Sequence, residues 1–197
     1  MSIKTSLTSY RSQLVPNLVP TCVNLGTIAY NVTMYPLKLA LLGSFQATWK
    51  QNPLTNFRSD KIRALLAYLA VESDQPHRRE QLAVLLWPES AYGMRNLRKS
   101  LFRLRQTLDN YQVGLSDALL TITRQTVTLK KSALTLDSVQ FEQLLAHVAA
   151  HTHHALFSCV SCLEKLEEGV ALYRGDFLSG FSLPDCNGFE EWLLFKR

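Results

Sequence analysis

The chain has 197 residues and a formal net charge of +5, with 47% hydrophobic and 19% charged residues. These proportions are those of an ordinary folded protein, and the length suffices for one or two domains with a sizeable core. A membrane span is excluded because no apolar run approaches the roughly 20 residues that a bilayer requires, and Pro16 and Pro20 break any signal-peptide core. Four cysteines are too few for a disulfide framework at this length, which favours a reducing, cytoplasmic setting.

The charge is unevenly distributed along the chain. Residues 1–57 carry four basic and no acidic residues. Residues 58–131 carry thirteen basic and seven acidic residues, net +6, and residues 132–197 carry four basic and nine acidic residues, net −5. A basic N-terminal part and an acidic C-terminal part favour two modules with different partners. We expect the N-terminal part to bind a polyanion, and the C-terminal part to present a helical surface that contacts protein or solvent.

The apolar residues of 1–35 follow neither a helical nor a strand period, and Ser, Thr, Asn and Pro are scattered among them. We predict a disordered leader here. Met34 lies just before the first convincing strand and is an alternative translation start, in which case residues 1–33 are not translated.

A winged-helix layout is predicted for residues 36–131. A small antiparallel sheet comes first, with strands at Leu37–Leu42, Phe45–Trp49 and Leu54–Phe57 and a turn at Asn52-Pro53. Three helices follow, from Ser59 to Val71, from His77 to Trp87 and over 94–108; then come a loop at 109–118 and a hairpin at 119–129. In such a layout the second and third helices form a helix-turn-helix, the third enters the major groove, and the hairpin is the wing.

The helix at 94–108 carries the candidate DNA contacts. Leucines at 97, 101, 104 and 108 form one apolar stripe, and between Glu89 and Asp109 the chain has five basic residues and no acidic one. Arg pairs with guanine, Asn or Gln with adenine, and further cations meet phosphates. We predict groove contacts from Arg95, Asn96, Lys99 and Arg103, and backbone contacts from Arg98, Arg105, Arg58, Lys61 and the wing-tip Arg124. Phe102 also points outward, to touch a thymine methyl or to pack on the wing. The alternative for this helix is a solvated basic surface.

A helical module is predicted for residues 134–197. Asp137 caps or precedes its first helix, and Phe189 opens its last. A middle helix from Cys162 to Tyr173 is predicted to face inward with Leu163, Leu166, Val170 and Tyr173.

The linker HTHHALFSCVSC between the first two of these helices combines histidines with a C-x-x-C pair. Thiolates and imidazoles in one short loop can form a tetrahedral zinc site, here from Cys159, Cys162, His151 and His154. Two alternatives stay open: a polar loop with incidental cysteines, and a redox pair, which no adjoining βαβ pattern supports.

The stretches LKLALLGSFQATW, SDKIRALLAYLA, REQLAVLLWPES and NLRKSLFRLRQTL resemble the OmpR/PhoB-type winged helix of bacterial transcriptional activators of the antibiotic-regulatory-protein (SARP) class. The following DSVQFEQLLAHV and LEEGVALYRGDFLSGFSLPDCNGFEEWLL resemble the bacterial transcriptional activator domain (BTAD) of that class. The resemblance covers residues 36–197. It implies an α+β winged helix-turn-helix with an N-terminal antiparallel sheet, followed by an all-α, tetratricopeptide-like module. That module normally continues further, so we expect a truncated or short member, or helices supplied from elsewhere.

The leading hypothesis is a sequence-specific DNA-binding regulator of transcription. Its expected partners are double-stranded DNA, RNA polymerase or another protein at the helical module, and, by resemblance, a second copy in a homodimer. The runner-up is a protein-interaction adaptor that works through the acidic helical module. A metal-binding redox sensor with DNA binding as its output is compatible with the leading hypothesis. No phosphate-loop, dinucleotide-binding or nucleophile-elbow motif occurs, so we predict neither an enzyme nor a cofactor other than zinc.

Overall fold

The fold is described from a computed structural model for residues 36–73, 75–152 and 156–197. Contacts join the described residues in one compact unit. The predicted leader at 1–35, and with it the question of Met34, lies outside the described residues.

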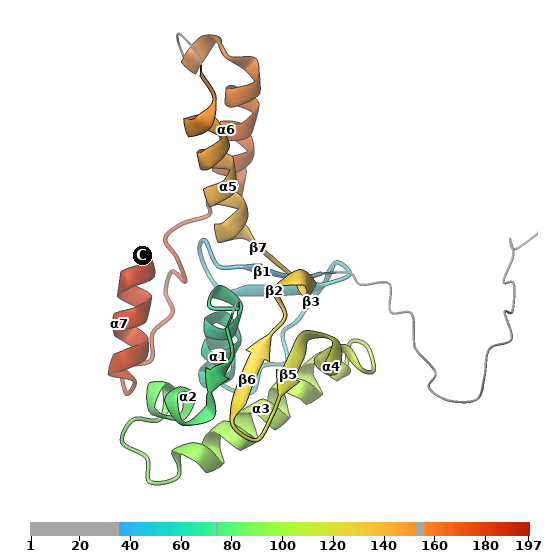
Figure 1. Cartoon of the computed structure of the whole chain (residues 1–197), viewed down its shortest axis with the longest axis vertical. Helices are drawn as coiled ribbons and strands as arrows, with labels where there is room; N and C mark the ends of the chain where they lie inside the picture. The colour runs from blue at the N-terminus through green and yellow to red at the C-terminus, as the bar shows by residue number, and fades with distance from the viewer. Residues whose placement is uncertain (1–35, 74, 153–155) are drawn as a thin grey trace, which may run out of the picture. The chain divides into compact units, whose positions relative to one another are not determined.

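The strands are β1 (Leu37–Ala40), β2 (Gln46–Trp49), β3 (Asn52–Pro53), β4 (His77–Arg78), β5 (Leu120–Ile122), β6 (Thr126–Leu129) and β7 (Leu134–Leu136). The α-helices are α1 (Asp60–Val71), α2 (Arg79–Leu86), α3 (Gly93–Asp109), α4 (Leu115–Leu119), α5 (Asp137–Ala150), α6 (Val160–Leu172) and α7 (Asn187–Lys196) (Figure 1).

The first sheet joins the start of the predicted winged helix to its end. Its strand order is β3-β2-β1-β7, with β1 antiparallel to β2 and parallel to β7. The N-terminal sheet is therefore confirmed, with its first three strands antiparallel as predicted, but β7 makes the sheet mixed. The sequence does not indicate β7, because three residues are too short for a periodic signal and the pairing with β1 is long-range.

The predicted turn at Asn52-Pro53 and the predicted strand at Leu54–Phe57 are wrong. Asn52–Pro53 is itself β3, paired with β2, and the chain reverses earlier, at Lys50 and Gln51. Both turn residues have positive φ, +48° and +68°. Such turns favour Gly and Asn, so Lys and Gln give no local sign of the reversal.

A second sheet, of order β4-β6-β5, supports the helix-turn-helix. The helix predicted to begin at His77 is wrong at its start, because His77–Arg78 forms β4 and pairs with β6. The backbone N–H of Arg79 then donates to the carbonyl of Gln125, 2.8 Å away, as α2 begins. These are long-range hydrogen bonds that local periodicity does not reveal. The predicted loop at 109–118 is also wrong in part, because most of α4 lies within it.

One hydrophobic core lies between the first sheet and the helices α1, α2 and α3. Ile62, Leu65, Leu66 and Leu69 of α1 and all four leucines of the α3 stripe are at most 3% exposed. The apolar spacing read from the sequence is therefore confirmed for both helices. None of the helices in the described part of the chain has the length and apolar character needed to cross a membrane.

The Asp137 carboxylate joins the first sheet to α5. It is 6% exposed and accepts hydrogen bonds from the backbone N–H groups of Leu41 and Leu42, at 2.7 and 2.9 Å. The Arg174 guanidinium lies 3.6 Å from its second oxygen. The sequence predicts that Asp137 caps or precedes this helix; in the structure Leu136 is the N-cap and Asp137 is the first residue of α5. Its carboxylate binds the backbone directly after β1.

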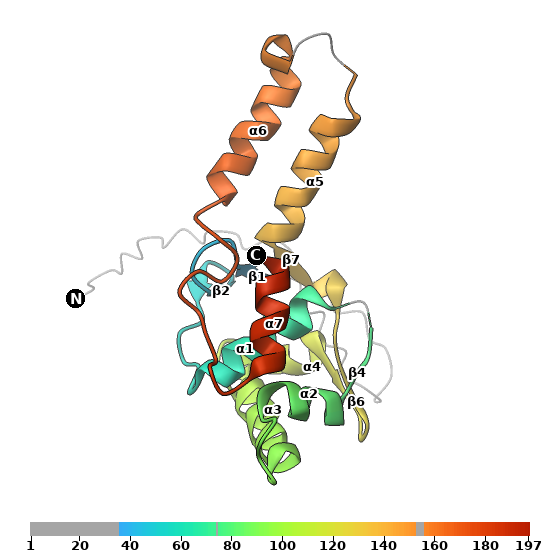
Figure 2. The same ribbon diagram turned by 90° about the vertical axis from the view of Figure 1, so that its left-hand side faces the viewer.

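Helices α5 and α6 pack against each other as a helical hairpin (Figure 2). Among the described residues of these two helices, only Asp137, Cys162 and Gly169 are buried. The inward prediction is wrong for Leu163, Val170 and Tyr173, which are 38%, 74% and 48% exposed. The face of α6 turned to α5 instead contains Gly169, which lies beside the Phe141 ring.

After α6 the chain returns to the core of the first module. Leu42 forms an isolated β-bridge with Phe177, and Phe189 and Leu193 of α7 belong to the same hydrophobic core. α7 lies beside α2 (Figure 2). The module boundaries at 36–131 and 134–197 stay a prediction, but residues of both segments share one core.

We predict that Asp137→Asn destabilises the fold by about 1–3 kcal/mol, because the buried amide cannot replace both strand hydrogen bonds and the ion pair with Arg174. Urea unfolding at neutral pH measures the change. Asp185→Asn removes a charge from an exposed position and should change the free energy of unfolding by less than about 0.5 kcal/mol. Equal effects of the two substitutions would contradict the role of Asp137.

A second prediction concerns Glu72, whose Oε1 accepts from Trp192 Nε1 at 2.9 Å and lies 3.0 Å from Lys196 Nζ. Burial raises the pKa of the Glu72 carboxyl, but these hydrogen bonds and the Lys196 charge lower it more, so its pKa lies below the ordinary 4.5. A carboxyl with a lowered pKa stabilises the fold above its unfolded pKa and ceases to do so as the pH falls through the folded one. The anchoring of α7 should therefore weaken below about pH 4.5.

Urea midpoints measured between neutral pH and pH 3 test this prediction, and Glu72→Gln should flatten their pH dependence. Glu80→Gln, at an exposed position of α2, is the matched control and should leave the profile as in the wild type. Identical profiles for wild type and Glu72→Gln would contradict the assignment.

Candidate nucleic-acid interface

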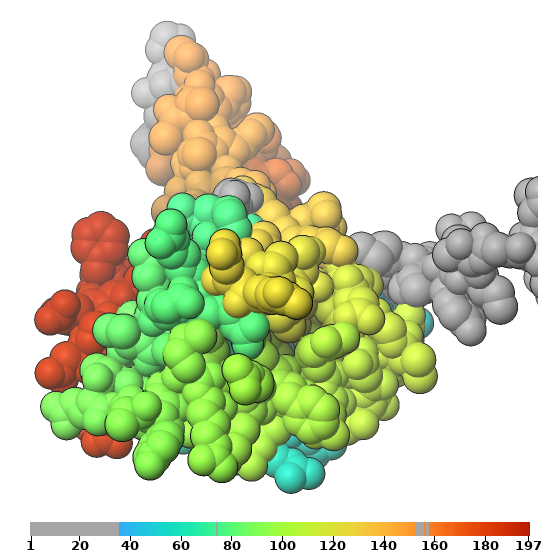
Figure 3. Space-filling view, turned by 60° about the horizontal axis from the view of Figure 1, so that its bottom comes forward, coloured from blue at the N-terminus to red at the C-terminus, as the bar shows by residue number. Residues whose placement is uncertain are grey.

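The two sides of α3 differ in chemistry. Its leucine stripe is buried in the core, where α3 packs against α1, α2 and α4, and this burial fixes the rotation of the helix. The opposite side is exposed and cationic, with Arg95, Arg98, Lys99, Arg103 and Arg105 all in solvent. Figure 3 shows α3 exposed on the same face as the wing, which we define as β5, β6 and their turn at 123–125. The geometry therefore presents a cationic helix beside a β-hairpin.

Two of the residues predicted to contact DNA are engaged within the protein. Asn96 is half-buried, and its amide donates to Ser90 Oγ at 3.3 Å. Arg105 is exposed but forms an ion pair with Asp117 of α4 at 2.6 Å. The positive charge of α3 is therefore concentrated on its N-terminal and central turns.

A polar cavity of about 630 Å³ lies beside the C-terminal half of α3. Arg58, from the connection before α1, and Arg103 both line it, together with the Gln106 and Asn110 side chains. No acidic residue is among its lining residues. The structure thus brings together two cations that are 45 positions apart in the sequence, in a hollow that suits a phosphate group.

The tip of the wing is held in a fixed turn. Thr123 Oγ1 accepts hydrogen bonds from the backbone N–H groups of Gln125 and Thr126, at 3.2 and 2.9 Å. Arg79 donates to the carbonyl of Thr123 at 3.2 Å and so ties the turn to the start of α2. Arg124 is exposed at this tip, as the sequence indicates.

Other residues on this face differ from their predicted roles. Lys61 is half-buried, and its Nζ lies 5.6 Å from the centre of the Trp87 ring. This contact leaves its charge less available for the DNA backbone. Arg78 is a cation that the sequence analysis missed; it is exposed on β4, in register with Thr126 of the wing. The sequence signal that could have identified Arg78 is the Arg78-Arg79 doublet at the start of α2. Phe102 is 61% exposed, as its predicted outward orientation implies, and the choice between its two predicted contacts stays a prediction.

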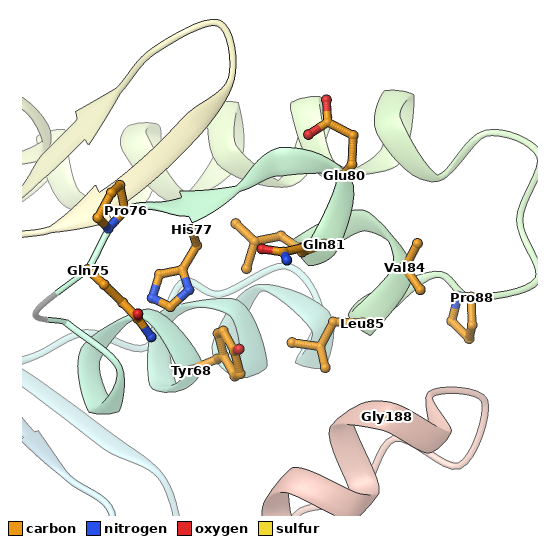
Figure 4. Close-up of a pocket in the computed structure, with 11 residues that line it drawn as sticks. Tyr68, Gln75, Pro76, His77, Glu80, Gln81, Val84, Leu85, Pro88 and Gly188 are labelled. Atoms are coloured by element: carbon orange, nitrogen blue, oxygen red, sulfur yellow. The ribbon is translucent and has the colours of Figure 1, made fainter.

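A second cavity, of about 750 Å³, lies between α1, α2 and α7 (Figure 4). Tyr68, His77 and Leu85 line it, and Gly188 of α7 closes one side. His77 Nε2 is already engaged with the carbonyl of Glu72 at 2.7 Å. No Lys or Arg lines the cavity, so it does not extend the basic face.

At the far end of the α5–α6 hairpin, the structure brings together three of the four predicted zinc ligands. His151 Nδ1 lies 3.0 Å from Cys162 Sγ and 3.3 Å from Cys159 Sγ. Burial and the neighbouring Cys159 thiol raise the pKa of Cys162. His154, the fourth predicted ligand, lies outside the described residues.

No family model matches the chain, and no curated protein matches it. Among solved structures, the chain is similar to Mycobacterium tuberculosis EmbR in complex with a low-affinity phosphopeptide, with a TM-score of 0.61 and 21% identity. The match covers 81% of this chain and 41% of the EmbR chain, so the chain spans about two-fifths of EmbR. At this identity the likeness shows the fold alone. It supports the fold predicted from the sequence at a coarse level, a mixed α/β module with an N-terminal sheet joined to helices.

Proposed function

We propose that the protein is a sequence-specific DNA-binding regulator of transcription that inserts α3 into the major groove. The observation that carries this proposal is the exposed cationic side of α3, whose opposite side is locked into the core by four buried leucines. A helix held in this way presents its cations with a fixed orientation, as base recognition requires.

The spacing of the cations suits the groove. Arg95, Lys99 and Arg103 follow one another at i, i+4 and i+8, so they form a row along the helix. Successive members are about 6 Å apart along the axis, which is close to the rise of two base pairs. We assign base contacts to this row.

Phosphate contacts flank the row on both sides. Arg58 lines the cavity beside Arg103 and is the candidate for one DNA strand. Arg124 at the wing tip and Arg78 on β4 are the candidates for the other side of the groove. Asn96 contacts adenine only if its amide gives up the bond to Ser90, and Arg105 reaches phosphate only if it leaves Asp117. Both therefore rank below the other predicted contacts.

A second candidate function is protein binding through the helical segments. Several large apolar side chains there are exposed: Val170 by 74%, Leu194 by 73% and Phe195 by 84%. Exposed apolar patches mark protein contacts. RNA polymerase, another protein or a second copy of the chain is the expected partner in this case. The phosphopeptide belongs to EmbR and carries no assignment here.

Selection of bound sequences from a randomised duplex library, with the full chain at two salt concentrations, separates the two functions. A regulator enriches one motif, and its affinity falls steeply as the salt concentration rises. Salt-sensitive binding without enrichment would indicate a non-specific polyanion binder. No binding at either salt concentration would favour the protein-binding function.

We predict that Lys99→Ala and Arg103→Ala each weaken binding to the selected duplex by about 1–3 kcal/mol. Loss of a base contact weakens only the preferred sequence, whereas loss of a phosphate contact weakens all sequences alike and lowers the salt slope by about 1. Titration of labelled duplexes against each variant measures both effects.

Lys165→Ala is the matched control, because it removes one positive charge from α6, outside the proposed interface. It should bind DNA like the wild type. Unchanged affinity in both α3 variants, or an equal loss in all three, would refute the assignment of α3.

A further inference from the structure

Two helix ends meet at the far end of the α5–α6 hairpin, and each supplies ligand atoms of the kind that soft divalent metals prefer. His151 is the C-cap of α5, Cys159 is the N-cap of α6, and Cys162 lies in the first turn of α6. Their ligand atoms all lie within 4.8 Å of one another.

The distances between these atoms approach those of a tetrahedral zinc site. With Zn–S bonds of about 2.3 Å and Zn–N bonds of about 2.0 Å, sulfur and nitrogen ligands are about 3.5 Å apart. His151 Nδ1 lies 3.0 Å from Cys162 Sγ and 3.3 Å from Cys159 Sγ. The two nitrogen–sulfur distances would therefore lengthen by about 0.2–0.5 Å around the ion.

Hydrogen bonding alone explains this convergence poorly. Nδ1 of a histidine carries either one proton or one lone pair, so it can form one good hydrogen bond at a time. Here a single nitrogen faces two sulfur atoms at comparable distances. A metal ion placed between the three atoms engages all of them at once.

The hairpin also lacks a core of its own. Cys162 is fully buried, but apart from it and Gly169 no residue of α6 is buried, and Asp137 alone is buried in α5. Small elements with little buried apolar surface depend on other stabilising links, of which metal ions are one kind. A metal at the far end complements the Asp137 contacts at the near end.

We propose that His151, Cys159 and Cys162 bind a Zn²⁺ ion that ties the end of α5 to the start of α6. On binding, the two thiols release their protons to solvent, and the neutral imidazole donates its Nδ1 lone pair. One position of the tetrahedron takes a fourth ligand. The site is structural and independent of DNA binding by α3. A Cys159–Cys162 disulfide is the competing chemistry.

The test uses the full chain, purified without chelator and under reducing conditions. Elemental analysis and titration with Zn²⁺ against a chromophoric chelator should give about one zinc ion per chain. Replacement of zinc by Co²⁺ should give the thiolate-to-cobalt charge-transfer band and the strong visible bands of a tetrahedral site. Zinc should also raise the melting temperature of the wild type.

Matched variants locate the site. Cys159→Ser, Cys162→Ser and His151→Ala should each lose stoichiometric zinc and the rise in melting temperature. His147→Ala removes an exposed histidine one turn earlier in α5 and should retain both. If a variant fails to fold, the cobalt spectrum of the wild type decides by itself.

Three outcomes would overturn the proposal. One is a wild-type chain that takes up no zinc and shows no thiolate-to-cobalt band. Another is zinc binding that persists in all three ligand variants, which would place the ion elsewhere. The last is a Cys159–Cys162 disulfide whose reduced form still binds no zinc, which would indicate a redox pair.

Discussion

Burial of one side of α3 is the constraint on which the proposed interface depends. Leu97, Leu101, Leu104 and Leu108 are at most 3% exposed, and turning the helix to hide its cations would bring those leucines into water. Fully burying a leucine side chain contributes about 1.5–3 kcal/mol, so the four together outweigh any repulsion among exposed cations. The same burial that stabilises the fold therefore directs the positive charge outward.

The remaining elements hold the core around α3 through two sets of contacts, one at α2 and one at the first sheet. The wing turn is tied to the start of α2 through Arg79, and α2 is covered by α7, which is anchored at Glu72. The first sheet receives α5 through the buried carboxylate of Asp137. Segments from the end of the chain thus complete the core under the predicted helix-turn-helix.

Features set by nearby residues could be predicted from the sequence, whereas features set by distant partners could not. The helical rows of α1 and α3 and the exposed wing tip at Arg124 follow from local spacing. β7, β4 and the turn at Lys50 and Gln51 depend on pairing with strands elsewhere, which periodicity does not record. Within the interface, the cationic face of α3 was predictable, but the tie of Arg105 to Asp117 and the cavity joining Arg58 to Arg103 are tertiary.

The most direct test of the account is to map where DNA touches the protein. Amide chemical shifts of the full chain, recorded as duplex DNA is added, report the contacted residues. We predict that the largest changes fall on Arg95 to Arg103 of α3, on the wing turn and near Arg58, and that they fade as the salt concentration rises. Changes confined to α5, α6 and α7, with none on α3, would contradict the central claim.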